Sequence, residues 1–194
     1  MKRKKQPVNS EPILLSSGIL LLIFSLFIPI PIILFMQDLL FFKDDTLSVI
    51  RHDEAFKGLA AAFAWLGIVA LGAYATIVYA DKKRKPYRLK WVHLILAFLS
   101  VPIALFSLFS YSSVQETYIE TQNFGEFSSE RIELDEVSQI TRHYEPNPTR
   151  VTSITFVSPD KEITIPFSAE DGRTSRAIQR IIGDYSIPVI EDGL

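Results

Sequence analysis

Few side chains of this 194-residue sequence have the types and spacing that catalysis or metal binding requires. The chain has no cysteine, which excludes thiol nucleophiles, cysteine zinc sites, iron–sulfur clusters and disulfide scaffolds. His143 is not accompanied by a Gly-x-Ser-x-Gly turn, and no His-x-x-x-His or Glu-x-x-His spacing occurs. Glu133, Asp135 and Glu136 are explained more simply as a solvated edge than as a calcium site. We therefore expect no enzyme, no catalytic residue, no metal and no cofactor.

Three arginines near the C-terminus form the one pattern that suggests a binding contact. Arg173, Arg176 and Arg180 recur at steps of three and four, so they share one stripe of a predicted helix, apart from its apolar stripe. Two explanations are open. The stripe is either a solvated face or a contact for an anionic partner, such as a lipid headgroup, a wall polymer or an acidic protein surface.

The elements that position these residues include three apolar runs, at about 12–36, 59–80 and 92–111, that contain no charged side chain. Each run is long enough to cross the ~30 Å hydrocarbon core of a bilayer as a helix. The runs predict an integral membrane domain over residues 1–111 with three transmembrane α-helices. They exclude a soluble enzyme, and the absence of charges within them argues against ion transport.

Prolines and small residues predict local features of these helices. Pro29 and Pro31 should kink or end the first helix near its outer end, and Pro102 should kink the third helix. The second helix is rich in small side chains, which let helix backbones approach closely in lipid. Three of them fall on one stripe and predict packing, more readily against a helix of the same chain than against a second subunit: Ala60, Ala64 and Gly67.

The loop at residues 81–90 is strongly basic, with six basic side chains in ten residues: Lys82, Lys83, Arg84, Lys85, Arg88 and Lys90. It is either an anchor that orients the chain or a site for anionic lipids. The N-terminal segment has four basic residues, and the loop at 37–58 has three. The positive-inside rule therefore places the N-terminus and the 81–90 loop in the cytoplasm. Three crossings of the plasma membrane then leave the C-terminal domain extracellular.

The first loop, residues 37–58, mixes acidic and basic side chains. Within it, residues 46–57 are expected to form a short helix that lies on the membrane surface. Leu47, Ile50 and Phe56 would then face the membrane.

The C-terminal domain, residues 112–194, contains seven basic and fifteen acidic residues, a net charge of −8. Its apolar residues alternate with period two, which predicts strands at 117–122, 131–134, 137–144, 150–157 and 162–167, with a loop at 145–149. A final helix should begin near Ser168 and Asp171, end near Gly183, and bury Ala177, Ile178, Ile181, Ile182 and Tyr185. Antiparallel strands closed by one amphipathic helix indicate a small α+β domain.

This pattern resembles bacterial pleckstrin-homology-like domains. The segments concerned are Arg131–Ile140, with an acidic Asp-Glu-Val step, the hairpin Ile154–Ile165 and the terminal helix. The resemblance covers about 80 residues and implies an open barrel plugged by the helix. The sequence departs from the family in having fewer clear strands than the usual seven. The resemblance implies a binding or assembly scaffold and no particular ligand.

Three hypotheses for the function follow. The leading one is a non-enzymatic integral membrane protein with an exposed binding or assembly domain, an accessory or scaffold component of a bacterial cell-envelope complex. The alternative is a membrane sensor or regulator that signals to a cytoplasmic partner through the basic 81–90 loop. The third is a membrane enzyme that acts on lipid. The expected partners are the lipid bilayer and a protein or membrane complex, and not nucleic acid, because the basic residues cluster beside membrane segments.

Overall fold

The computed structural model describes residues 10–146 and 149–193, and its contacts divide the chain into two compact units. The first unit contains Met1–Pro31 and Lys57–Leu105, and the second contains Ile32–Phe56 and Phe106–Leu194. The expected boundary at 111/112 does not coincide with this division, because residues of the first loop pack with the C-terminal part. The basic residues 2–5, and residues 147–148 of the expected loop, lie outside the described residues.

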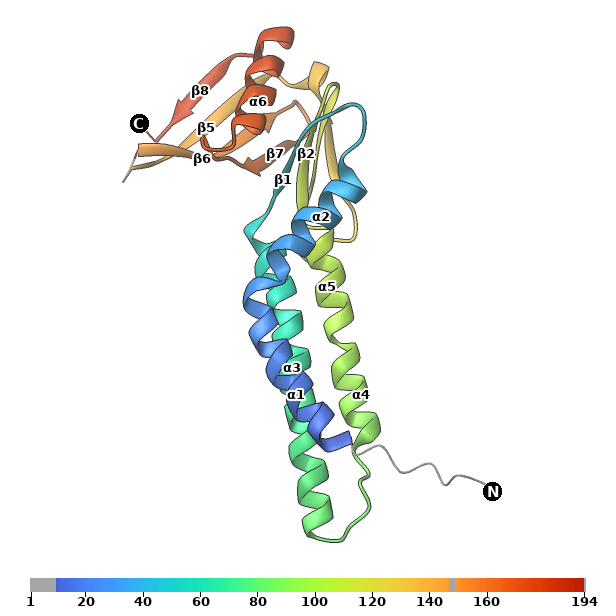
Figure 1. Cartoon of the computed structure of the whole chain (residues 1–194). Coiled ribbons are helices and arrows are strands. Elements are labelled where there is room, and N and C mark those ends of the chain that lie inside the picture. Colours follow the sequence, from blue (N-terminus) through green and yellow to red (C-terminus); the bar gives the residue numbers. More distant parts are fainter. Residues whose placement is uncertain (1–9, 147–148, 194) are drawn as a thin grey trace. The chain divides into compact units, whose positions relative to one another are not determined.

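Helices form the first unit (Figure 1): α1 Ser10–Phe27, α3 Asp53–Lys82, α4 Lys90–Phe98 and α5 Ser100–Leu108, of which the last residues belong to the second unit. The segments Asp53–Lys82 and Lys90–Leu108 are each long and apolar enough to cross a membrane. Glu11–Phe27 together with α2, Pro29–Phe41, gives a third span if this pair, bent by 63°, is one span. The described residues therefore contain two helices with the length and composition of a span, or up to three.

Two breaks in the helices coincide with the prolines. Helix α1 ends at Phe27 and α2 begins at Pro29, which has no N–H to bond with the preceding turn. Helices α4 and α5 are separated at Leu99, because Pro102 lacks the N–H that would bond with the carbonyl of Phe98. The break predicted at Pro29 is confirmed by a bend of 63°, and at Pro102 the helix is interrupted at Leu99.

Helices α1 and α3 approach each other through two glycines. A Cβ atom built on Gly18 would lie 3.1 Å from the carbonyl oxygen of Gly67, and one built on Gly67 would lie 2.9 Å from that of Gly18. Neither position has room for a side chain, so the backbones lie close together. Gly67 of the small-residue stripe thus lies against a helix of the same chain. The indole N–H of Trp65 donates to the carbonyl of Leu96 at 2.6 Å and joins α3 to α4.

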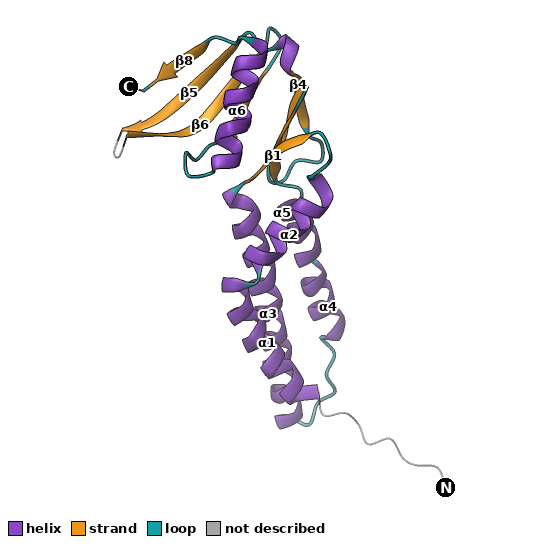
Figure 2. Cartoon of the chain, turned by 45° about the horizontal axis from the view of Figure 1, so that its top comes forward, coloured by secondary structure: helices purple, strands orange, loops and turns teal. Residues whose placement is uncertain are grey.

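Two four-stranded sheets form most of the second unit (Figure 2), with strand orders β1-β2-β3-β4 and β7-β6-β5-β8. Neighbouring strands are antiparallel except β5 and β8, which are parallel. The edge strands β4 and β7 are in contact. The elements are β1 Thr46–Arg51, β2 Tyr111–Gln115, β3 Tyr118–Gln122, β4 Glu130–Glu133, the 3₁₀ helix η1 Leu134–Glu136, β5 Gln139–Pro146, β6 Thr149–Val157, β7 Glu162–Pro166, α6 Gly172–Tyr185 and β8 Val189–Asp192.

The surface helix expected over residues 46–57 is wrong in its first half. Thr46–Arg51 is the strand β1, which pairs with β2, and α3 begins at Asp53. The third apolar helix ends at Leu108 rather than at residue 111. The reason is that Tyr111–Gln115 forms the strand β2, which pairs with β1. The pairing supplies the backbone hydrogen bonds that a short surface helix would have had to make internally.

Two smaller features at the C-terminal end also differ from the prediction. Strand β5 continues to Pro146, which was expected in a loop, because a proline at the end of a strand costs no ladder hydrogen bond. Strand β8, which the sequence pattern did not predict, joins the sheet beside β5. The five strands that were expected lie within two residues of their predicted bounds, and β6, for example, begins at Thr149 rather than at Arg150.

The core of the second unit lies between the two sheets and α6. Its fully buried side chains include Ile119 and Ile132 of the first sheet, Ile140 and Phe156 of the second, and Ile178 of α6. Helix α6 packs on β1, β2 and η1. Its buried residues are Thr174, Ala177, Ile178 and Ile181, whereas Ile182 is only partly buried and Tyr185 is exposed.

The ends of α6 differ from the prediction. Its N-cap is Asp171 rather than Ser168, because the carboxylate accepts hydrogen bonds from the N–H groups of Arg173 and Thr174. The helix continues past Gly183 and ends at Ser186, which adopts a left-handed conformation with φ of 52°.

Candidate functional site

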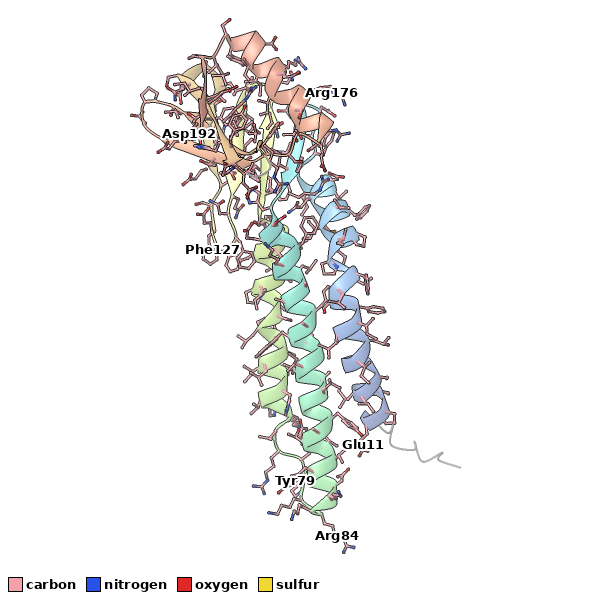
Figure 3. All side chains as sticks on the ribbon, turned by 90° about the vertical axis from the view of Figure 1, so that its left-hand side faces the viewer. Glu11, Tyr79, Arg84, Phe127, Arg176 and Asp192 are labelled. Atoms are coloured by element: carbon pink, nitrogen blue, oxygen red, sulfur yellow. The ribbon has the colours of Figure 1, made fainter. Side chains whose placement is uncertain are left out.

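The three arginines of α6 line one pocket on the surface of the second unit. Arg173, Arg176 and Arg180 are exposed, and Figure 3 shows Arg176 projecting outward from the helix. Together with Leu47 of β1 and Ala177 of α6 they surround a volume of about 220 Å³. The floor is thus apolar and the rim is basic, although the domain as a whole is acidic. We call this pocket the arginine groove.

The contacts of the three guanidinium groups differ. Arg180 pairs with Glu116 at 3.1 Å and with Asp184 at 3.4 Å. Arg176 Nε donates to the carbonyl of Gly172 at 2.8 Å. Arg173 lies over the ring of Phe42, with 5.2 Å between the guanidinium carbon and the ring centroid. Each guanidinium has five N–H donors, so these contacts hold the side chains in place and leave further donors for an anion.

A second pocket of about 290 Å³ continues the arginine groove along α6. The two pockets share Leu47 and Arg180, and the second is lined in addition by Glu116, Thr117, Ile181, Asp184 and Tyr185. The tyrosine hydroxyl donates to the carbonyl of Glu116 at 3.1 Å. The combined surface is basic at the N-terminal end of α6 and mixed in charge at the C-terminal end, so an anionic group would bind at the N-terminal end.

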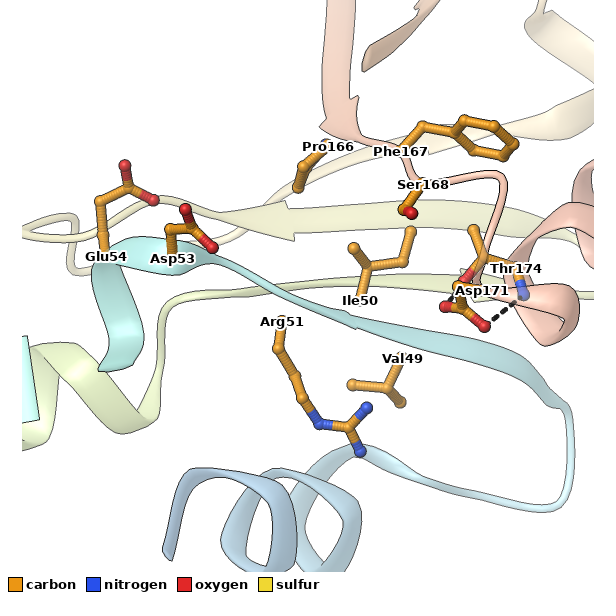
Figure 4. Close-up of a pocket in the computed structure, with 10 residues that line it drawn as sticks. All are labelled: Val49, Ile50, Arg51, Asp53, Glu54, Pro166, Phe167, Ser168, Asp171 and Thr174. Atoms are coloured by element: carbon orange, nitrogen blue, oxygen red, sulfur yellow. Dashed lines mark hydrogen bonds between the residues drawn. The ribbon is translucent and has the colours of Figure 1, made fainter. Parts of the chain in front are cut away.

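Another pocket of the second unit, about 520 Å³, lies between β1 and the segment that leads into α6 (Figure 4). Its lining comes from the end of β1, the start of α3, the end of β7 and the first turn of α6: Val49, Ile50, Arg51, Asp53, Glu54, Pro166, Phe167, Ser168, Asp171 and Thr174. Sequence reasoning missed this pocket because it assigned β1 to a helix. The alternation of polar and apolar residues over residues 46–49 was the available signal.

Several polar groups of this pocket have structural partners, although the Nε of Arg51 is buried without a hydrogen-bond partner. Arg51 forms an ion pair with Asp38. Burial tends to raise the pKa of Asp171, but hydrogen bonds from Thr174 and Arg173 and the nearby Arg51 charge outweigh it and lower the pKa below its ordinary range. The hydroxyl of Thr174 lies 2.7 Å from that of Ser48 on β1. These contacts connect α6 to β1, so the pocket lies where the two elements pack against each other.

A buried polar network lies at the end of β1. The ring of His52 is 5% exposed, and its Nε2 lies 2.7 Å from the hydroxyl of Ser112, which lies 2.7 Å from that of Thr121. Burial lowers the pKa of His52, and the charge of Glu54 opposes this effect. His52 is therefore a neutral, hydrogen-bonded residue at the base of the first sheet.

The remaining predicted positions do not line the arginine groove. The six basic residues of the 81–90 loop are exposed. Tyr87 in that loop hydrogen-bonds to Nδ1 of His93 at 2.8 Å. The nitrogens of His143 lie 2.8 Å from the hydroxyl of Thr155 and 3.2 Å from the carboxylate of Asp192. Within the described residues, no group of three or more histidine, aspartate or glutamate side chains could hold a metal ion.

The comparisons with known proteins give no family assignment. No protein-family model, no curated protein and no solved structure matches this chain.

Proposed function

We propose that this chain is a non-enzymatic integral membrane protein of the plasma membrane, with three transmembrane spans and a domain outside the bilayer that binds a partner. The partner would be a protein or a complex of the cell envelope, and the protein would act as its accessory or scaffold component. The observation that supports this proposal best is the pairing of β1 with β2.

Strands β1 and β2 pair over Thr46–Arg51 and Tyr111–Gln115, although two apolar helical segments separate them along the chain. An open sheet has no place in the hydrocarbon core, where unpaired backbone groups would lack partners. Both strands must then lie on one side of the membrane. The two segments between them, Asp53–Lys82 and Lys90–Leu108, would cross it once each and return the chain to that side.

The charge distribution supports an orientation for this arrangement. The basic loop at 81–90 joins the two segments, and its six basic side chains favour the cytoplasmic face. The sheets would then lie outside the cell. The N-terminal segment, with four basic residues, would lie inside if α1 and α2 together cross the bilayer once.

The arginine groove supports binding as the role of the domain. It collects three guanidinium groups over an apolar floor in an otherwise acidic domain, which suits an acidic protein surface or another anionic group. His52 and Asp171 use their polar atoms in hydrogen bonds that stabilise the fold. The described residues form eight strands in two sheets that enclose a core together with α6.

Cysteine labelling tests the membrane proposal, since any introduced thiol is the only one in the chain. Asp160 in the β6–β7 turn and Gln179 on α6 are exposed and suit the outer sites, whereas Ser112 and Ser158 are buried. On intact cells a membrane-impermeant reagent should label Asp160→Cys and Gln179→Cys, and Tyr87→Cys only after the cells are opened. The reverse pattern would place the domain in the cytoplasm, and labelling of all three on intact cells would contradict the spans.

Photo-crosslinking tests the binding surface. A photoreactive residue in place of Gln179, exposed on α6, should give a discrete adduct in native membranes. Replacing Arg173, Arg176 and Arg180 with Gln should abolish that adduct. The matched control is Arg150→Gln, because Arg150 forms a similar exposed ion pair with Glu145 away from α6. An adduct that survives the triple replacement would exclude the arginine groove as the contact.

The second candidate, a sensor or regulator, is favoured by the connection between β1 and α3. Strand β1 ends at Arg51 and α3 begins at Asp53, so only His52 separates them. Helix α3 then continues without a break to Lys82, at the start of the basic loop. A partner that displaced β1 would thus pull directly on a helix that ends at the cytoplasmic surface. Adducts trapped at Tyr87 that change when the outer partner is removed would favour this function over a passive scaffold.

A further inference from the structure

We propose that the loop between β3 and β4 enters the membrane interface and that the rings of Phe124 and Phe127 contact lipid acyl chains. This inference rests on the membrane embedding proposed above. It adds a second attachment of the domain to the bilayer, besides the helices themselves.

The exposure of the two rings is the first observation. Phe127 is 91% exposed and Phe124 is 39% exposed. Both rings contact Phe106, with centroid distances of 5.0 Å for Phe127 and 6.1 Å for Phe124, in edge-on geometry. Figure 3 shows Phe127 beside the end of α5.

The contact with Phe106 identifies what covers the rings. Phe106 belongs to the apolar segment Lys90–Leu108, one of the two helices with the length and composition of a membrane span. Where Phe106 is at the depth of the bilayer boundary, the loop that touches it must be at the same depth. The outer faces of Phe124 and Phe127 then meet the same solvent as the end of the span, which is lipid rather than water.

The loop is built to present these rings. Gly125 has φ of +90°, a conformation that side chains disfavour, and it allows the sharp turn between the two aromatic residues. The carboxylate of Glu126 accepts from the N–H of Asn123 at 3.1 Å and from its side-chain amide at 3.4 Å. The side-chain amide of Gln122 donates to the carbonyl of Glu126 at 2.9 Å. The carboxylate of Glu126, the one charged group of the turn, thus bonds within the loop. The rings of Phe124 and Phe127 remain exposed.

Neighbouring aromatic residues are consistent with a boundary at this level. At the ends of α2 and α5, Phe41 stacks on Tyr111 with 3.6 Å between centroids and meets Phe109 edge-on at 5.9 Å. Tryptophan and tyrosine side chains are enriched where membrane proteins cross from hydrocarbon to headgroups, and Tyr111 is a residue of this kind. An aromatic ring that moves from water to acyl chains gains free energy in proportion to its apolar area.

Lipid-depth quenching of the full chain tests the inference. Three single-cysteine variants would carry an environment-sensitive fluorophore: Phe127→Cys in the loop, Asp160→Cys in the exposed β6–β7 turn, and Ile68→Cys at the exposed middle of α3. The chain would be reconstituted in phosphatidylcholine–phosphatidylglycerol vesicles, with or without bromine atoms on the acyl chains. Emission from Phe127→Cys should shift to the blue and be quenched several-fold more than emission from Asp160→Cys.

The helix probe separates the two ways of failing. If Ile68→Cys is quenched but Phe127→Cys behaves like Asp160→Cys, the helices are embedded and the loop is not, which overturns the inference alone. If Ile68→Cys is also unquenched, the membrane embedding proposed above is wrong, and the inference falls with it. Phe127 is exposed, so its replacement should leave the fold intact and each result interpretable.

Discussion

The hydroxyl group of Ser48 lies 2.7 Å from that of Thr174, and both side chains are buried. Thr174 also donates to the carboxylate of Asp171 at 2.5 Å. A hydroxyl has one proton, and an ionised carboxylate can only accept, so Ser48 must be the donor in the pair with Thr174. In the sequence, β1 lies between the apolar helices α2 and α3. The hydrogen bonds from Ser48 through Thr174 to Asp171 connect it to the C-terminal helix α6.

Thr174→Val should therefore destabilise the domain. The variant keeps the shape of the side chain but leaves the buried Ser48 donor without its acceptor and removes one donor from Asp171. The expected loss is about 1–3 kcal/mol in the free energy of unfolding. Pulse proteolysis of the purified chain in urea measures it. Thr174→Ser keeps the hydroxyl and should lose less, whereas a loss equal to that of Val would assign the effect to packing.

His52 should make the stability of the domain depend on pH in the weakly acidic range. Burial lowers its pKa in the folded state, whereas an unfolded histidine has a pKa of about 6.5. As the pH falls below that value, the unfolded chain takes up a proton that the folded domain resists, so stability is lost. In His52→Gln the fall between about pH 7 and pH 5 should flatten. His143→Gln, the matched control, should retain it, and an unchanged slope in His52→Gln would refute the prediction.

The two faces of α6 should respond oppositely to substitution. Ile178 is 2% exposed, and an aspartate there would bury a charge without a partner, at a cost of about 3 kcal/mol or more. Such a loss should unfold a domain of this size. The triple change of Arg173, Arg176 and Arg180 to Gln should leave cooperative unfolding intact, because exposed ion pairs contribute little. If Ile178→Asp unfolds as the unchanged chain does, α6 is not part of the core.

The β1–β2 register can be trapped by a disulfide. Val49 and Ser113 are direct partners in the antiparallel ladder, where Cα atoms lie about 4.5–5.5 Å apart, a separation that a disulfide can bridge. Val49→Cys with Ser113→Cys should oxidise, and mass spectrometry of the unreduced digest should show the two peptides linked. Val49→Cys with Val114→Cys should not, because residue 114 points to the opposite face. Linkage only in the second variant would mean that the register is shifted by one residue.

Local patterns were sufficient for much of this chain. The apolar runs predicted where the helices lie, and Pro29 and Pro102 marked where the helices are interrupted, but α3 is longer than its run and extends over Asp53–Lys82. Ala177, Ile178 and Ile181 recur with helical period and are the buried apolar residues of α6. These features depend on neighbours within a few residues, so the sequence alone contains them.

The strand β1 shows where local patterns mislead. Leu47 and Ile50 are three residues apart and lie beside apolar helices, which suggested a surface helix. The segment is a strand because β2, more than 60 residues later, supplies its hydrogen-bond partners, as in the pair Val49 and Ser113. Nothing near residue 49 in the sequence records that pairing.

Strand β2 was hidden for a different reason. All five of its residues are buried, yet Ser112, Ser113 and Gln115 are polar and give no apolar alternation to read. They are tolerated inside because partners from distant segments satisfy them, such as His52 and Thr121 for Ser112.

The arginine groove combines both kinds of information. The spacing of Arg173, Arg176 and Arg180 placed them on one stripe of α6, and the sequence alone determined this because helical period is a local property. Only the tertiary structure decided that Leu47 forms the floor and that Glu116 holds Arg180, because these neighbours come from strand ends far away along the chain. The total free energy of the packed core determines which distant strands pair. Each segment contributes only a small part of that free energy, so the sequence of one segment does not reveal its partner.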